Sequence, residues 1–215
     1  ARNVVCGMAR LNGFSVGVIA NNPMFGAGTL DPQACHKIIR LATVCDSYNI
    51  PIIFLADVPG FMVGERVEHE LMLHWGMRMM HALQNCSAPT LTVCIRKAFG
   101  LAWQAMNGSQ MPALGVYSWP GAEIGFMDPE VGVNVAFGSK LARIDDSETR
   151  ESERVALVRE VGESTNPYEA AGTMRIDEII DPGDTRGVLA HDLEMLAHRS
   201  VPPPEARPLS YWPTC

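Results

Sequence analysis

Two short, largely apolar runs, Pro51–Val58 and Thr90–Ile95, most constrain the fold of this chain. Loop residues bound each run, and such runs are typical of strands buried on both faces of a parallel sheet. Parallel strands need a long crossover connection, usually a helix, and the residues between the two runs have a helical pattern over Glu68–Asn85. The sequence therefore predicts an α/β protein with a largely parallel sheet.

The remaining segments extend this alternation of strands and helices. Asn12-Gly13 separates two strand-like runs, Val4–Leu11 and Phe14–Asn21, and predicts a hairpin. Asp31-Pro32 is typical of a helix start. Further strands are predicted at Leu114–Trp119, Glu123–Met127 and Ile176–Ile180, and further helices at Pro129–Lys140, Ser147–Gly162, from Asn166, and at Thr185–Ser200. We expect one domain over residues 1–200 and a Pro-rich tail over residues 201–215.

Charge and cysteine usage exclude several classes of protein. A net charge of −7 gives no basic footprint for nucleic acid, and no apolar run is long enough to span a membrane. The six cysteines include no C-x-x-C pair, and most lie in apolar runs, as expected in a reducing cytosol. A hydrophobic content of 47% favours an oligomer. The chain starts without Met or a signal peptide, so we expect a fragment or one part of a longer protein.

Residues 96–106, which follow the second apolar run, are the strongest indication of chemistry. A strand that ends in a small-residue turn at a helix start leaves backbone N–H groups without internal partners, and the helix dipole adds positive charge there. Such a turn can hold an oxyanion such as an enolate. We therefore predict Gly100, Leu101 and Ala102 as catalytic residues, acting on a carbonyl compound without a side-chain nucleophile.

Other familiar motifs fail on spacing or composition. Gly26-Ala27-Gly28 resembles the start of a dinucleotide fingerprint, but Asp31 stands where its third glycine should be and would repel a pyrophosphate. His69 and His74 are five residues apart and lie on different helix faces, so we predict no metal site.

Charged residues near the strand ends leave alternatives open. Asp57 ends the first apolar run, and its carboxylate either faces a cleft or caps the N–H groups of the following turn. Arg96 and Lys97 either bind a phosphate or carboxylate or form ion pairs at a subunit contact. We favour ligand binding, because the two residues adjoin the oxyanion-type turn.

Nine short blocks follow one another in a distinctive order along the chain. They are Ala9–Gly13, Asn22-Pro23, Gly28–Asp31, Cys45–Pro51, Asp57–Phe61, Arg96–Gly100, Trp119–Ile124, Asn166–Ala171 and Asp181–Arg186. By their order and number, these blocks resemble the C-terminal half of the β-type carboxyltransferase subunit of biotin-dependent acyl-CoA carboxylases, the propionyl-CoA and methylcrotonyl-CoA carboxylase group. The resemblance covers roughly residues 4–200.

The resemblance implies a crotonase-like fold of the ClpP/crotonase type, an α/β class in which a ββα superhelix forms layered sheets. It implies a cytoplasmic enzyme, or one of the mitochondrial matrix if eukaryotic. Its substrates are a coenzyme A thioester and carboxybiotin on a carrier domain of another subunit. The implied partners are the complementary N-terminal carboxyltransferase half, a biotin carboxylase and biotin carrier subunit, and further copies in a homo- or hetero-oligomer, a hexameric ring.

The resemblance also carries the binding residues. In the family, the N–H groups at the positions of Leu101 and Ala102 hold the biotin ureido oxygen. Here Leu101 replaces a family glycine, Trp103 a tyrosine and Gln104 an aspartate of the acyl pocket. The predicted substrate- and biotin-binding residues are Asn22, Pro23, Gly26, Ala27, Gly28, Pro59, Gly60, Phe61, Phe99, Trp103 and Gln104.

The predicted function is carboxyl transfer from carboxybiotin to the α-carbon of an acyl-CoA, with enolates held by backbone oxyanion holes. Two alternatives follow from the changed turn. The first is a biotin-independent acyl-CoA decarboxylase or acyl-transfer enzyme of the same fold, and the second is a non-catalytic partner subunit of the complex.

Overall fold

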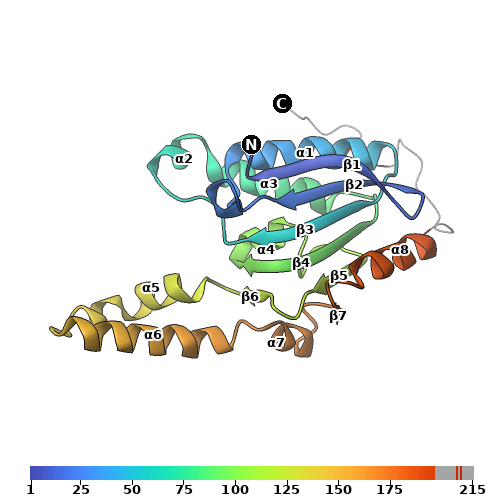
Figure 1. Cartoon of the computed structure of the whole chain (residues 1–215). Coiled ribbons are helices and arrows are strands. Elements are labelled where there is room, and N and C mark those ends of the chain that lie inside the picture. The colour runs from blue at the N-terminus through green and yellow to red at the C-terminus, as the bar shows by residue number, and fades with distance from the viewer. Residues whose placement is uncertain (197–206, 208, 210–215) are drawn as a thin grey trace.

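A seven-stranded sheet forms the centre of the structure, a computed structural model that describes residues 1–196, 207 and 209 (Figure 1). The strands follow the order β1-β2-β3-β4-β5-β7, and β6 pairs with β4. Apart from the antiparallel β1–β2 pair, the strand pairs of the described chain are parallel, as the apolar runs predicted. The strands are β1 (Val4–Leu11), β2 (Phe14–Asn21), β3 (Ile52–Val58), β4 (Thr90–Phe99), β5 (Gly115–Ser118), β6 (Glu123–Gly125) and β7 (Glu178–Ile179).

The predicted hairpin is confirmed. Leu11 pairs with Phe14 across a two-residue turn. Asn12 and Gly13 both have positive φ, 48° and 88°, which a turn matching the twist of the two strands requires.

Helices α1 (Pro32–Ser47) and α3 (Met72–Gln84) cover one face of the sheet (Figure 1). Asp31 caps α1 as predicted, because its carboxylate accepts a hydrogen bond of 2.7 Å from the N–H of Ala34. The core between these helices and the sheet is built from large, fully buried side chains, among them Ile38, Ile39, Phe54, Met79 and Leu83.

The single helix predicted over Glu68–Asn85 is wrong: two helices, α2 (Glu65–His69) and α3, occupy this region. Leu71 separates them, with a left-handed backbone at φ 63°. Only Val67 is buried in α2, whereas α3 buries a methionine-rich face. The break lets α3 turn onto the sheet while α2 extends from the body.

Strand β4 runs further than predicted, to Phe99 instead of Ile95. Two neighbours extend it: β6 pairs with Lys97–Phe99, and Val58 of β3 pairs with Ala98 after a register shift. Arg96 and Lys97 therefore lie inside a strand, and the turn is confined to Gly100.

Helix α8 (Thr185–Leu196) covers the opposite face of the sheet. Leu189 and Leu193 pack there against Ile53, Leu91 and other apolar side chains. The hydroxyl of Tyr117 in β5 donates a hydrogen bond of 2.7 Å to Asp192 and ties the helix to the sheet.

A pair of antiparallel helices, α5 (Pro129–Leu141) and α6 (Ser147–Glu163), projects from the body and is called the arm below (Figure 1). None of the α6 residues is buried. The chain returns to the sheet through α7 (Pro167–Gly172), which Asn166 caps.

Two residues of the predicted Pro-rich tail are described, and both are buried against the body. Arg207 donates hydrogen bonds to the carbonyls of Asp46 and Ser47 at the end of α1, where carbonyl groups lack helical partners. The other residues from 197 onward, including the predicted end of the last helix, lie outside the described residues. Among the described helices, none has the length and apolarity needed to cross a bilayer.

Candidate functional site

Loops at the carboxyl ends of β2 and β3 meet at one edge of the sheet. Parallel strands end at the same edge, where ligands of open α/β sheets bind. The first loop includes the short helix η1 (Gly26–Gly28), and the second begins at Pro59. Leu30 joins them, because its N–H donates to the carbonyl of Gly60 at 3.1 Å and its carbonyl accepts from Met62 at 2.8 Å. The predicted residues of both loops are therefore brought together.

Asn21, which the sequence did not single out, organises this edge. Its amide nitrogen donates to the carbonyl of Gly28 at 2.9 Å, and its oxygen accepts from the N–H of Asp57 at 3.1 Å. Gly28 has φ 80°, and a Cβ there would lie 2.7 Å from the Asp57 carbonyl. The close approach of the loop to β3 therefore requires glycine.

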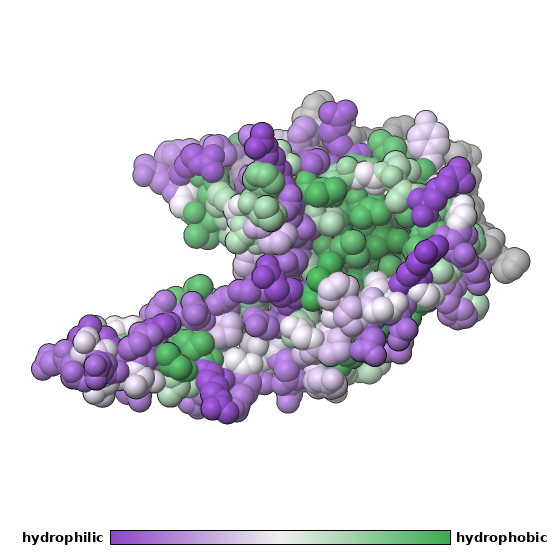
Figure 2. Space-filling model, viewed as in Figure 1, coloured by the Kyte–Doolittle hydropathy of each residue, from purple (hydrophilic) through white to green (hydrophobic). Residues whose placement is uncertain are grey.

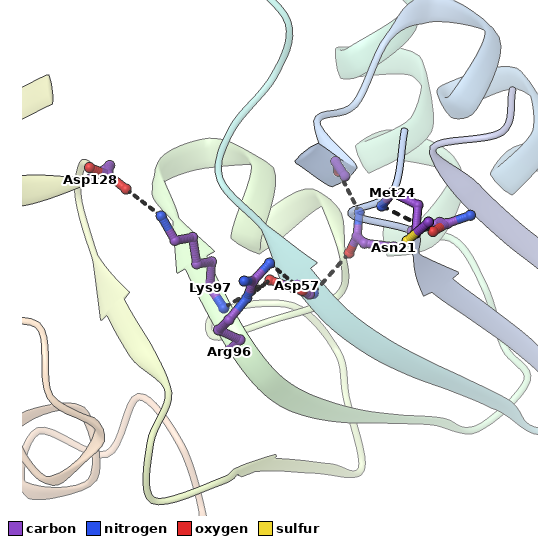
Figure 3. Close-up of polar contacts among 8 residues, drawn as sticks. Asn21, Met24, Asp57, Arg96, Lys97 and Asp128 are labelled. Atoms are coloured by element: carbon purple, nitrogen blue, oxygen red, sulfur yellow. Dashed lines mark hydrogen bonds and ion pairs between the residues drawn. The ribbon is translucent and has the colours of Figure 1, made fainter. Parts of the chain in front are cut away.

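Arg96 and Lys97 each have a carboxylate partner within the chain, on opposite sides of β4 (Figure 3). Arg96 forms two hydrogen bonds of 3.1 and 3.0 Å with the buried Asp57, which raise the pKa of the guanidinium. Lys97 Nζ lies 2.7 Å from Asp128 Oδ2. The carboxylate of Asp57 also accepts from the N–H of Lys97 at 3.3 Å. The carboxylate of Asp57 therefore accepts hydrogen bonds from Arg96 and Lys97 of β4, and within the described chain it makes none with the turn that follows Asp57.

The predicted turn begins helix α4 (Gly100–Ala105). Gly100 has φ 58°, and a Cβ there would lie 2.9 Å from the carbonyl oxygen of Phe126. Within the described part of the chain, the N–H groups of Leu101 and Ala102 make no hydrogen bond, as expected at a first helical turn. Leu101 is half-exposed, whereas Ala102 is buried, so of these two residues only Leu101 lies at the surface.

An apolar groove of about 160 Å³ lies beside this turn. Phe61 and Leu101 both line it, so the structure brings the second loop and the turn to one place. Helix α3 supplies one wall. The remaining lining residues are Met62, Val63, Glu68, Met72, Leu73, Gly76 and Met77. Figure 2 shows an open hollow between the α2 side of the body and the arm.

Other predicted binding residues lie outside the lining of this groove. Trp103 is buried, and its indole N–H donates to Ser109 at 3.1 Å. Gln104 is partly buried, and its amide nitrogen donates to Gln110 at 3.0 Å. Phe99 is a core residue at the end of β4. Whether a bound acyl group contacts Gln104 stays a prediction.

The described residues include no cluster of His, Cys, Asp or Glu side chains arranged to hold a metal ion. Burial raises the pKa of the Cys35 thiol to about 12 and that of the Cys6 thiol to about 11. These thiols remain protonated at neutral pH and are poor nucleophiles. The unpaired backbone donors are therefore the chemically distinctive groups of this region.

Comparisons with known proteins identify the family of this chain. Residues 1–208 match the family described as "Carboxyl transferase domain". The chain is 41% identical over 207 residues to the propionyl-CoA carboxylase carboxyltransferase subunit of Haloferax mediterranei, covering 96% of this chain and 40% of that protein. It is 39% identical over 197 residues to the methylmalonyl-CoA carboxyltransferase 12S subunit of Propionibacterium freudenreichii subsp. shermanii, covering 92% of this chain and 37% of that protein.

Solved structures give the same result. A transcarboxylase 12S crystal structure, described as a hexamer with methylmalonyl-coenzyme A bound, superposes with a TM-score of 0.84 at 38% identity. The match covers 94% of this chain and 39% of that one. The β subunit of Pseudomonas aeruginosa geranyl-CoA carboxylase gives a TM-score of 0.81 at 26% identity, covering 96% and 38%. The crotonase-like α/β fold is therefore confirmed, and the chain spans about 40% of the length of these relatives.

Proposed function

The chain belongs to the carboxyl transferase domain family, and on this premise we propose that it is one half of an acyl-CoA carboxylase carboxyltransferase. The proposed reaction moves a carboxyl group from carboxybiotin to the α-carbon of an acyl-CoA. The observation that carries the proposal is the pair of N–H groups at Leu101 and Ala102, which have no partner within the described chain. Preorganised backbone donors of this kind stabilise developing oxyanions without a charged side chain.

The residues beside the turn fit a biotin ring system. A ureido oxygen is a hydrogen-bond acceptor and matches the two N–H donors, while the apolar groove at Phe61 and Leu101 matches the ring carbons. When bound, carboxybiotin would supply CO₂ and a base for the α-proton. In this proposal Leu101 and Ala102 hold the ureido oxygen, Gly100 aims their N–H groups, and the loops at Asn22–Gly28 and Pro59–Phe61 form the wall of the site.

We propose that the site is completed by partners. The chain spans about 40% of its relatives' length, so the complementary N-terminal half would supply most coenzyme A contacts and the second oxyanion hole. A biotin carboxylase and carrier subunit would deliver biotin, and the assembly would be a hexameric ring. The five described cysteines are free thiols, which supports a location in the cytoplasm or, in a eukaryote, the mitochondrial matrix.

Leu101 supports one alternative function. Its half-exposed side chain lies in the groove where the family resemblance places a glycine, and it narrows the space for biotin. The same turn would then serve a biotin-independent decarboxylase or acyl-transfer enzyme. A non-catalytic partner subunit is the third candidate.

One assay separates the three functions. The assembled complex is incubated with acyl-CoA and a biotin carrier whose carboxyl group is labelled and, in parallel, with a malonyl-type thioester without the carrier. Labelled carboxyacyl-CoA supports carboxyl transfer, carrier-independent loss of CO₂ from a malonyl-type thioester supports the decarboxylase, and neither product supports the non-catalytic subunit. Leu101→Gly sharpens the result: it should keep or increase biotin-dependent transfer, and it should impair a decarboxylase that needs the leucine.

A further inference from the structure

We propose that Lys97 and Asp128 are positioning residues that hold the Gly100–Ala102 turn in its active geometry by fixing it to the base of the arm. This inference rests on the proposed function of the turn. It assigns the lysine of the Arg96-Lys97 pair to a contact within the chain rather than to a ligand.

The Lys97–Asp128 contact is short and largely protected from water. The distance from Nζ to Oδ2 is 2.7 Å, and the two side chains are only 31% and 19% exposed. Burial is the largest single influence on the pKa of Asp128 and would raise it, but the hydrogen bond and charge of Lys97, together with the N–H groups of Glu130 and Val131, lower that pKa below its ordinary value. Charge-assisted hydrogen bonds with this geometry are stronger than neutral ones.

Asp128 is also the residue at which the arm begins. It is the N-cap of α5, and its other carboxylate oxygen accepts from the N–H of Glu130 at 3.1 Å. One carboxylate thus joins β4 to the first turn of the arm. Figure 3 shows Lys97 reaching Asp128 on the side opposite to the Arg96–Asp57 pair.

Strand β6 and Phe126, which lie just before Asp128 in the chain, pack against the turn. Strand β6 pairs with Lys97–Phe99, and Phe126 follows it directly. The carbonyl oxygen of Phe126 lies 2.9 Å from the position of a Cβ on Gly100. Because the φ of 58° at Gly100 sets where the next two N–H groups point, a shift of this segment would misdirect them. A misplacement of about 1 Å can cost about 10²-fold in rate.

The arm supplies a matched control. Lys140 in α5 and Glu153 in α6 form an ion pair of 2.9 Å, similar in chemistry and length to Lys97–Asp128. Its side chains are more exposed, 61% and 40%, and it joins the two arm helices instead of joining the arm to the turn. Loss of the control pair should therefore leave the turn unchanged.

The test uses the assembled complex and measures kcat and KM for carboxyl transfer. We expect Lys97→Met and Asp128→Asn each to lower kcat by about 10- to 100-fold with little change in KM. The double variant should be no worse than either single one, because both remove the same contact. Lys97→Arg should retain most of the activity, and Lys140→Met should match the wild type.

Hydrogen–deuterium exchange of the peptide containing Leu101 and Ala102, in the same complex, gives a readout that does not need turnover. We expect faster exchange in Lys97→Met and Asp128→Asn and no change in Lys140→Met. Unchanged kcat and exchange in Lys97→Met would overturn the proposal. So would a large loss in Lys97→Met with a normal Asp128→Asn, since Lys97 would then act on a ligand. If the wild-type complex has no activity, the proposed function fails and the exchange measurement still decides the positioning role.

Discussion

Two pairs of helices in the described chain differ sharply in how much of their surface is buried. Helices α1 and α3 pack on the sheet, and α1 alone buries eight residues, from Pro32 to Asp46. In the arm, α5 buries three residues and α6 none. Exposed apolar side chains mark the arm and its base, with Val135 at 73% and Phe126 at 86%. Figure 2 shows apolar surface on the arm, away from the body.

This difference indicates which parts of the fold the chain can stabilise by itself. Helix α5 carries Val131, Val133, Val135 and Phe137, so apolar residues are not confined to one stripe. A helix of this kind is normally buried on several sides, yet α6 covers only part of it. We expect the body to fold from its own contacts, and the arm to gain its remaining cover from another polypeptide of the assembly.

The largest expected effect is a loss of folding free energy caused by a substitution in the body that leaves the arm unchanged. Phe54 is fully buried between the sheet and its helices, so Phe54→Ala should lower the free energy of unfolding by about 3–5 kcal/mol. Val135→Ala in the arm should change it by less than about 0.5 kcal/mol. Urea unfolding of the two variants measures both values. Equal losses would show that the arm is as well packed as the body in the free chain.

The next effect concerns the junction of the two regions. Gly100→Val places a Cβ at a φ of 58° and against the carbonyl oxygen of Phe126. We expect the assembled complex to lose activity by about 10²–10³-fold, the cost of losing an oxyanion donor. Gly121→Ala is the matched control, because nothing lies within 4 Å of its Cβ position. Normal activity in Gly100→Val would remove the turn from the proposed site.

Local signals in the sequence were sufficient for much of the body. The Asn12-Gly13 hairpin and the Asp31 cap depend on residues within a few positions of each other, and both were predicted correctly. The break at Leu71 and the extension of β4 were missed, because tertiary packing and the pairing with β6 decide them.

In the candidate site, too, features set by neighbouring residues could be predicted from the sequence, and features set by distant contacts could not. The turn at Gly100 could be predicted, because a strand, a glycine and a helix follow each other in the chain. The partners of Asp57 and Asp128 lie 39 and 31 residues away, so no local pattern reveals them. Asn21 carried one weak signal, an amide at the end of a strand, and its role appears only once loop and strand are placed together.

A smaller effect tests how strongly the body depends on local capping. Asp31→Ala removes the acceptor for the N–H of Ala34 at the start of α1, and should lower the free energy of unfolding by about 1 kcal/mol. Asp31→Ser retains a capping oxygen and should stay within a few tenths of the wild type. Urea unfolding distinguishes the two variants. If serine fails as badly as alanine, Asp31 acts through its charge or through other contacts.

The smallest expected effect is a gain in folding free energy from a substitution in helix α5 of the arm. Gly138 lies inside α5, and nothing is found within 4 Å of the position that a Cβ would take. Gly138→Ala removes backbone freedom from the unfolded chain and should stabilise the isolated chain by about 0.4–1 kcal/mol, measured by urea unfolding.

The same variant in the assembled complex tests whether another polypeptide covers the arm at this position. If another polypeptide packs closely at this glycine, Gly138→Ala should stabilise the chain but weaken assembly in analytical ultracentrifugation. Normal assembly would confine the contact to other parts of α5, such as Val131 and Val135. Destabilisation of the isolated chain would contradict the open surroundings of Gly138 and with them the contrast between body and arm.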